Sequence, residues 1–224
     1  MDSESLARSL EQLFEQTEDC SIESRDFQKP EFRSNQAIRY FSANRALLLD
    51  GLQLPATSSI LEFGAESGVL TRWLGERFAT VATLDNDMEF CRAVKKRCKD
   101  LDSVRVFNFD DSAFKPARSF DVAVAIMDEK SQKTIPVVSV LRRAKQALKK
   151  TGLLVLGLDV TPNVPSMRDV LVQQLKSYGF TGIRFFYAFP NVIFPRAIFS
   201  DDATSTPTAS VAATTSSSSR RSAT

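Results

Sequence analysis

The chain has 224 residues, of which 43% are hydrophobic and 25% are charged, so it can bury the core of one ordinary domain but hardly of two. With 29 Lys and Arg against 27 Asp and Glu, the net charge is +2, which argues against nucleic-acid binding through a strongly basic surface. Histidine is absent, which excludes Ser/His and Cys/His hydrolases and most transition-metal sites.

Apolar runs and cysteines point to the compartment. No apolar run approaches the roughly 18 residues that span a bilayer, and the acidic, polar N-terminus is unlike a secretory signal. We therefore expect no membrane span and a cytoplasmic location. The cysteines, Cys20, Cys91 and Cys98, are odd in number and lack CxxC spacing, which disfavours a disulfide framework or a zinc site. Cys91 and Cys98 lie on one face of a predicted helix and are expected in the core.

The first segments in chain order are an arm and a lead-in helix. Residues 1–34 predict a peripheral arm that begins with an amphipathic helix, because apolar residues recur three and four apart at Leu6, Leu10, Leu13 and Phe14. Residues 35–52 predict one helix that leads into the first strand. Tyr40 and Arg45 on this helix are placed to close over a ligand in the following turn.

The middle of the chain alternates strands and helices. The expected strands are SILEF, TVATLD, VRVFNF, FDVAVAIM and LLVLGLDV, and the helices between them include GVLTRWLGERF, MEFCRAVKKRCKDL and VVSVLRRAKQALKK. Strands that alternate with helices imply an α/β fold whose parallel sheet is joined by right-handed crossovers.

The end of the chain changes character. SMRDVLVQQLKSYGF predicts a helix, and IRFFYAF and VIFPRAIF predict a hairpin around Pro190 and Asn191. The sheet should therefore carry one antiparallel strand near its edge. Residues 201–224 are mostly Ser, Thr and Ala without an apolar period, which predicts a disordered tail after a domain of residues 35–200.

The turn GAESG follows the first predicted strand. Ligands of open parallel sheets bind beyond the carboxyl ends of the strands. Gly64 and Gly68 allow close backbone approach, and the helix that begins near Val69 presents free N–H groups to an anion. Close packing of this helix on the sheet would explain the glycines equally well.

Acidic residues end the next two strands. Asp85 can accept hydrogen bonds from both ribose hydroxyls of an adenosine, and its alternative role is to cap the next helix, for which Asp87 is better placed. Asp110 and Asp111 follow VRVFNF, where a carboxylate could reach an adenine amino group or simply line a solvated turn.

Five successive pieces, ILEFGAESG, TLDND, NFDDSAF, SFDVAVAI and LKKTGLLVLGLD, resemble the class I S-adenosylmethionine-dependent methyltransferases over about residues 35–200. The resemblance implies a Rossmann-like, doubly wound, mostly parallel seven-stranded sheet with an antiparallel edge strand. It also implies S-adenosylmethionine as the cofactor. The implied cofactor contacts are Glu62, Gly64, Ala65, Glu66, Gly68, Asp85, Asn86, Asp110 and Asp111.

A narrower likeness rests on YFSANRALLLDGL, GVLTRWLGER and FFYAFPNVIFPRAIFSDD. These look like the methyltransferase domains attached to bacterial glycosyltransferases and other surface-polysaccharide proteins. The likeness implies O-methylation of a sugar, a glycan or another small acceptor in polysaccharide biosynthesis, with a glycosyltransferase as a partner or neighbouring domain. The closing segment, residues 189–195, keeps the Phe-Pro at its start and the Pro at its end that are typical of these domains, but Val192 and Ile193 at its centre are apolar instead of polar.

Two positions bear on activity. Glu66 stands where the broad family favours glycine, and its charge would repel the cofactor's methionine carboxylate unless it points outward or meets the ligand's ammonium group. Asp128 and Glu129 follow the fourth strand and are the candidate bases for a sugar hydroxyl, although either could instead cap the next helix or solvate a loop.

Three other functions compete with methyl transfer. A non-catalytic Rossmann-like module in a glycan-synthesis assembly would accommodate Glu66 and the altered closing segment. A nicotinamide dehydrogenase is disfavoured because the loop lacks GxGxxG. Basic clusters suggest nucleic acid, but they fit the solvated faces of amphipathic helices better; they are Arg92, Lys95, Lys96, Arg97 and Lys99, and Arg142, Arg143, Lys145, Lys149 and Lys150.

Overall fold

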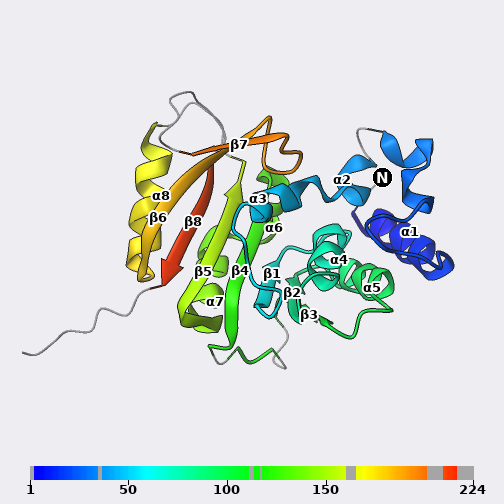
Figure 1. The fold of residues 1–224 in the computed structure, drawn as a ribbon, viewed down its shortest axis with the longest axis horizontal. Coiled ribbons are helices and arrows are strands. Elements are labelled where there is room, and N and C mark those ends of the chain that lie inside the picture. The colour runs from blue at the N-terminus through cyan, green and yellow to red at the C-terminus, as the bar shows by residue number, and fades with distance from the viewer. Residues whose placement is uncertain are drawn as a thin grey trace, which may run out of the picture.

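The computed structural model describes residues 3–34, 37–110, 114–116, 118–159, 165–200 and 209–215. These residues form one eight-stranded sheet in the order β3-β2-β1-β4-β5-β8-β6-β7, with helices on both faces (Figure 1). The strands are β1 (Ser59–Phe63), β2 (Thr80–Asp85), β3 (Val104–Asn108), β4 (Phe120–Met127), β5 (Leu148–Leu158), β6 (Phe180–Phe189), β7 (Ala197–Ser200) and β8 (Ala209–Thr215).

The first five strands are parallel, and their order reverses between β1 and β4. β1 pairs with β2 on one side and with β4 on the other, so that Glu62 lies opposite Thr83 and Val124. The predicted Rossmann-like, mostly parallel α/β fold is confirmed. Its topological switch point lies at the carboxyl end of β1, where the glycine turn follows.

The other end of the sheet differs from the prediction. β8 pairs antiparallel with both β5 and β6, and β7 pairs antiparallel with β6 at the sheet edge. The expected seven strands are therefore wrong, because the described residues contain eight. The eighth comes from the segment predicted to be disordered. The sequence ASVAATT combines β-branched and small residues, which can pair with the otherwise open edge of β5. The remaining residues of 201–224 lie outside the described part of the chain.

Helices cover the two faces of the sheet. α7 (Val137–Ala147) and α8 (Pro165–Ser177) place Leu141 and Leu175 in the core on one face. α3 (Leu47–Asp50) and α4 (Val69–Gly75) place Leu48 and Leu74 in the core on the other. The remaining helices are α1 (Ser3–Gln16), α2 (Ile38–Phe41), α5 (Met88–Arg97) and α6 (Glu129–Thr134).

The N-terminal helix packs against α5 at the end of the sheet away from α8 (Figure 1). Leu10 and Phe14 of α1 are buried, and Cys91 and Cys98 are also buried, as predicted. Acidic residues of α1 pair with the basic cluster of α5, as in the contact between Glu15 and Lys96. The expectation that this cluster is a solvated face is therefore only partly right, because α1 covers some of it.

The lead-in segment is not the single helix that its apolar spacing predicted. It divides into α2, a 3-10 turn over Ala43–Ala46, and α3. Ser42 causes the break, because its backbone is extended and its side chain accepts a hydrogen bond from the N–H of Asn44. The break places Arg39 and Arg45 on separate turns that both face the glycine loop.

Candidate functional site

The glycine loop connects β1 to α4 with a left-handed backbone at every second residue. The φ angles are 79° at Gly64, 49° at Glu66 and 72° at Gly68. A Cβ at Gly68 would lie 3.1–3.3 Å from Val94 of α5, so both this close helix contact and a φ of 72° favour glycine there, whereas the alternative interpretation placed the close packing against the sheet. A Cβ at Gly64 would meet only Ile135, at 3.8 Å, so the positive φ is what requires glycine there.

Glu66 occupies a backbone conformation that normally favours glycine. A side chain in the left-handed region costs roughly 1–2 kcal/mol. The carboxylate lies between two arginines, with 16% of the side chain exposed. Burial raises the pKa of Glu66, but Arg45 and Arg39 outweigh that effect and hold it below its ordinary value. The side chain therefore does not point outward, and its carboxylate oxygens are held by Arg39, Arg45 and Ser131.

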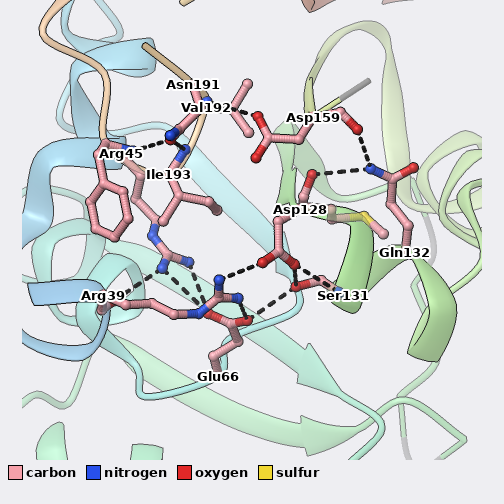
Figure 2. Close-up of polar contacts among 12 residues, drawn as sticks. Arg39, Arg45, Glu66, Asp128, Ser131, Gln132, Asp159, Asn191, Val192 and Ile193 are labelled. Atoms are coloured by element: carbon pink, nitrogen blue, oxygen red, sulfur yellow. Dashed lines mark hydrogen bonds and ion pairs between the residues drawn. The ribbon is translucent and has the colours of Figure 1, made fainter. Parts of the chain in front are cut away.

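Arg39 joins the glycine loop to the end of β4 (Figure 2). Its guanidinium binds Glu66 through Nη2 and Asp128 through Nη1. The Ser131 hydroxyl lies within hydrogen-bond distance of both acids, 3.0 Å from Glu66 Oε1 and 2.8 Å from Asp128 Oδ1, and can donate to either. Burial raises the pKa of Asp128, but Arg39 and Ser131 outweigh it and lower the pKa to about 2. Asp128 also caps α6 by accepting the Ser131 N–H, as one of the two interpretations predicted.

Arg45 supports the same network from deeper in the protein. Both of its terminal nitrogens lie 3.3 Å from Glu66 Oε2, and Nη2 also donates to the Arg39 carbonyl at 3.2 Å. Its side chain is only 2% exposed, against 19% for Arg39. The sequence placed Arg45 near the cofactor turn but did not single out Arg39, whose partners are 27 and 89 residues away.

Asp85 lies at the carboxyl end of β2 and holds the loop. Its Oδ2 accepts the Glu66 N–H at 2.9 Å, and its Oδ1 accepts the Asp87 N–H at 3.0 Å. Burial raises the pKa of Asp85 to about 6. Asp87, not Asp85, caps α5. Asn86 beside it donates to the Thr134 carbonyl at 3.0 Å.

The structure brings only some of the predicted site residues to one cleft. Gly64, Glu66, Asp85 and Asn86 line it together with Arg39, Tyr40, Phe90 and Ile135. The cleft has a volume of about 60 Å³, whereas sites for small molecules and cofactors occupy roughly 300–1,000 Å³. The hydrogen-bonding groups of the cleft are of the types that bind an adenosine cofactor. The volume of the cleft, however, is too small for such a cofactor while Arg39 bridges Glu66 and Asp128.

Other predicted residues lie apart from this cleft. Glu62 is buried below the loop, where its carboxylate accepts the Thr71 hydroxyl at 2.6 Å, and Ala65 is buried as well. Asp110 is largely exposed, with its carboxylate 3.6 Å from Arg143. Glu129 is exposed at the start of α6. Asp111 lies outside the described residues, and the cofactor roles of this group stay predictions.

The closing segment is hydrogen-bonded to Asp159, the residue that follows β5. The Val192 N–H donates to Asp159 Oδ1 at 3.1 Å, and Gln132 donates to the Asp159 carbonyl at 3.0 Å (Figure 2). Asn191 turns the segment by accepting the N–H groups of Ile193 and Phe194 at 3.0 and 2.8 Å. Val192 and Ile193 are buried, so the centre of this segment contributes apolar side chains to the core.

The fold and this loop define a class of protein. Residues 32–188 match the family model for a methyltransferase domain, which covers more than half of the chain. The chain therefore belongs to the methyltransferase domain family. No curated protein matches it.

Solved structures share the fold at low sequence identity. An S-adenosylmethionine-dependent methyltransferase from Aquifex aeolicus is 13% identical with a TM-score of 0.58, and the match covers 85% of this chain and 95% of that one. A possible histamine N-methyltransferase from Thermotoga maritima is 14% identical with a TM-score of 0.56, covering 86% and 97%.

A third structure contains a demethylated cofactor. The Haemonchus contortus phosphoethanolamine N-methyltransferase 2, in complex with S-adenosylhomocysteine, is 19% identical with a TM-score of 0.51, and the match covers 72% of this chain and 45% of that one. The fold of this chain is that of the S-adenosylmethionine-dependent methyltransferases, and S-adenosylmethionine is the cofactor of that fold.

Proposed function

We propose that this chain transfers a methyl group from S-adenosylmethionine to a hydroxyl of a sugar, a glycan or another small acceptor. The observation that carries the proposal is the loop after β1, whose left-handed backbone is hydrogen-bonded to the carboxylate of Asp85 at the end of β2. A loop and an acid at a topological switch point form the arrangement that receives the adenosine part of a nucleotide cofactor.

Each residue has a role in this proposal. Asp85 would accept hydrogen bonds from the ribose hydroxyls, and Gly64 and Asn86 would border the adenosine. Asp110 and Asp111 would reach the adenine amino group. The cofactor would supply an activated methyl group on a sulfonium, so that the protein needs chiefly to orient the acceptor and to exclude water. The absence of histidine is no obstacle to such a transfer.

A base at the end of β4 would assist a sugar hydroxyl. A carboxylate with a pKa of about 2 accepts protons weakly, so Asp128 is a poor base as long as Arg39 holds it. Glu129 stands next to it on the exposed start of α6. Once Arg39 has left, either acid would be able to accept the proton of the acceptor hydroxyl, and Glu129 is the more exposed of the two.

The acceptor and the surroundings of the protein are also proposals. The sequence resemblance to glycosyltransferase-attached domains supports a glycan acceptor and a glycosyltransferase partner, and the composition of the sequence supports a cytoplasmic location. Within the described residues, none of the helices has the length and apolar character needed to cross a membrane.

A second candidate is a non-catalytic Rossmann-like module that organises a glycan-synthesis assembly. The small cleft and the charge of Glu66 favour it, since both oppose a bound cofactor. The two candidates differ in whether the purified chain binds the cofactor at all.

Calorimetric titration with S-adenosylmethionine separates the two candidates. The proposed enzyme binds it, and Asp85→Ala weakens the binding about tenfold or more, because a buried carboxylate that accepts two ribose hydroxyls is lost. Asp102→Ala is the matched control, since Asp102 is exposed before β3 and away from the cleft. Absence of binding at millimolar ligand, both in wild type and in a variant with Arg39 replaced by alanine, would refute the enzyme, and an unchanged affinity of Asp85→Ala would refute the ribose assignment.

A further inference from the structure

The cleft is closed by one side chain that bridges two acids of different strands. Arg39 reaches Glu66 in the loop after β1 and Asp128 after β4, and both partners are mostly buried. A forked guanidinium suits such a bridge, because its nitrogens can hold two carboxylates at once. The bridge spans the ends of two strands that are already neighbours in the sheet, and it occupies the space between the loop and the end of β4 (Figure 2).

Glu66 takes part in the bridge at a position whose backbone favours glycine. Glycine would adopt the same φ of 49° without strain, and would leave more space. The carboxylate at this position contributes an acceptor for Arg39, Arg45 and Ser131. Glu66 thus has a strained backbone conformation and also provides the carboxylate that binds the loop to Arg39 and Arg45.

The two arginines differ in how readily they can leave. Arg45 is almost fully buried and would still neutralise Glu66 if Arg39 moved away. Arg39 is partly exposed on a four-residue helix, and its long side chain can rotate toward solvent. Its backbone is anchored, because its carbonyl accepts Arg45, and the next carbonyl, of Tyr40, accepts Arg97 and Ser67. Release therefore begins at the side chain.

We infer that Arg39 is a latch on the cofactor cleft, which must leave Glu66 and Asp128 before an adenosine cofactor can enter. The inference rests on the proposed function and adds a control of access to it. A protein whose binding-competent form is a minor population binds more weakly by that fraction. Breaking the latch should therefore tighten cofactor binding, opposite to the usual effect of removing a site residue.

The test measures the affinity for S-adenosylhomocysteine by calorimetry in wild type, Arg39→Ala and Arg39→Lys. Arg39→Ala is expected to bind about tenfold more tightly or better. Arg39→Lys keeps the charge but not the fork, and should gain less. Arg92→Ala is the matched control, because Arg92 pairs with acids of α1 and α5 outside the cleft and its loss should change nothing.

Salt gives a second readout that does not depend on a substitution folding well. The side chains of this ion pair are only 16–19% exposed, so salt screens it only in part. Raising NaCl from about 0.05 M to about 0.5 M should therefore tighten the binding of S-adenosylhomocysteine to wild type by a smaller factor than Arg39→Ala does. The affinity of Arg39→Ala should stay the same over that range.

The outcomes separate the latch from the proposed function. If Arg39→Ala binds S-adenosylhomocysteine no more tightly than wild type, the latch is overturned and the cofactor site stands. If neither wild type nor any variant binds at millimolar ligand, the proposed function fails and the latch fails with it. Tighter binding by Arg39→Ala, graded through Arg39→Lys and absent in Arg92→Ala, supports both.

Discussion

At the scale of single residues, the site is governed by carboxylates whose surroundings push their pKa values in opposite directions. Asp128 lies against Arg39 and has a pKa of about 2. Asp85 and Glu62 are buried with hydrogen-bond donors but form no ion pair; burial raises their pKa values to about 6 and about 7, and at Glu62 it outweighs the opposing charge of Arg45. Each shift follows from whether burial or a charged partner dominates.

The buried Glu62 leads to a prediction of how the free energy of unfolding depends on pH. Its pKa is higher in the folded protein, at about 7, than the ordinary 4.5 of the unfolded chain, so the folded state binds its proton more tightly. The stability that this proton confers is complete below pH 4.5 and is lost as the pH rises to 7. At about 1.4 kcal/mol per pKa unit, the loss is about 3 kcal/mol.

The measurement compares urea unfolding of wild type and Glu62→Gln at pH 5 and pH 8. Gln cannot ionise, and its amide oxygen can still accept the Thr71 hydroxyl that Glu62 accepts now. Wild type should lose about 2.5 kcal/mol more than the variant between the two pH values, because a part of the total loss has already occurred at pH 5. Parallel pH profiles would show that Glu62 ionises as readily in the folded protein as in the unfolded one.

At the scale of elements, a buried arginine couples the N-terminal arm to the glycine loop. Arg97 of α5 is fully buried, and Nη1 donates to the carbonyls of Tyr40 and Ser67 at 2.7 and 3.1 Å. Its guanidinium lies 4.9 Å from the ring centre of Phe14 and 5.4 Å from that of Phe27. Among the described residues, no carboxylate lies within ion-pair distance of it, and burial lowers the pKa of Arg97 to about 10.

Two substitutions at Arg97 separate packing from charge. Arg97→Ala leaves a cavity among the aromatic rings and should cost about 3–5 kcal/mol in the free energy of unfolding. Arg97→Met fills much of that space and removes a buried cation that has no acidic partner, so it should cost about 2 kcal/mol less. Chemical denaturation measures both. Equal losses would mean that the two carbonyl hydrogen bonds, which both variants remove, carry the stability.

Some of these elements could be predicted from the sequence and others could not. β1, β2 and β4 were recognisable because buried parallel strands are short apolar runs between helices, and Asp87 was recognisable as a cap. The break at Ser42 was not, because the apolar residues on either side keep the helical spacing. The strand Ala209–Thr215 was missed because Ser, Thr and Ala carry little apolar signal, and its pairing depends on the distant β5.

At the scale of the whole molecule, segments far apart in the sequence meet around the site. The arm and the lead-in segment bring Tyr40 and Arg39 over the loop, α6 contributes Ser131, and the closing segment binds Asp159 through Val192. The acids of this site could be predicted from strand ends. The role of Arg39 could not be predicted, because no local sequence feature distinguishes it. A glutamate at a glycine position of the loop does, however, require a nearby cation, and that requirement could have directed the search to the arginines of the lead-in segment.

The same arrangement explains how a methyltransferase fold can keep its loop and yet have little room for a ligand. Gly64 and Asp85 retain the backbone shape and the acid of a cofactor site. Glu66 and Arg39 take up the space between them. The central claim is therefore that a cofactor site lies beneath this ion pair.

Calorimetric titration of S-adenosylhomocysteine into Glu66→Gly tests that claim most directly. The substitution relieves the positive φ at this position, removes one of the two acids that hold Arg39, and widens the cleft. We predict one bound ligand per chain, about tenfold tighter than in wild type. If folded Glu66→Gly shows no binding at millimolar S-adenosylhomocysteine, there is no cofactor site beneath the ion pair.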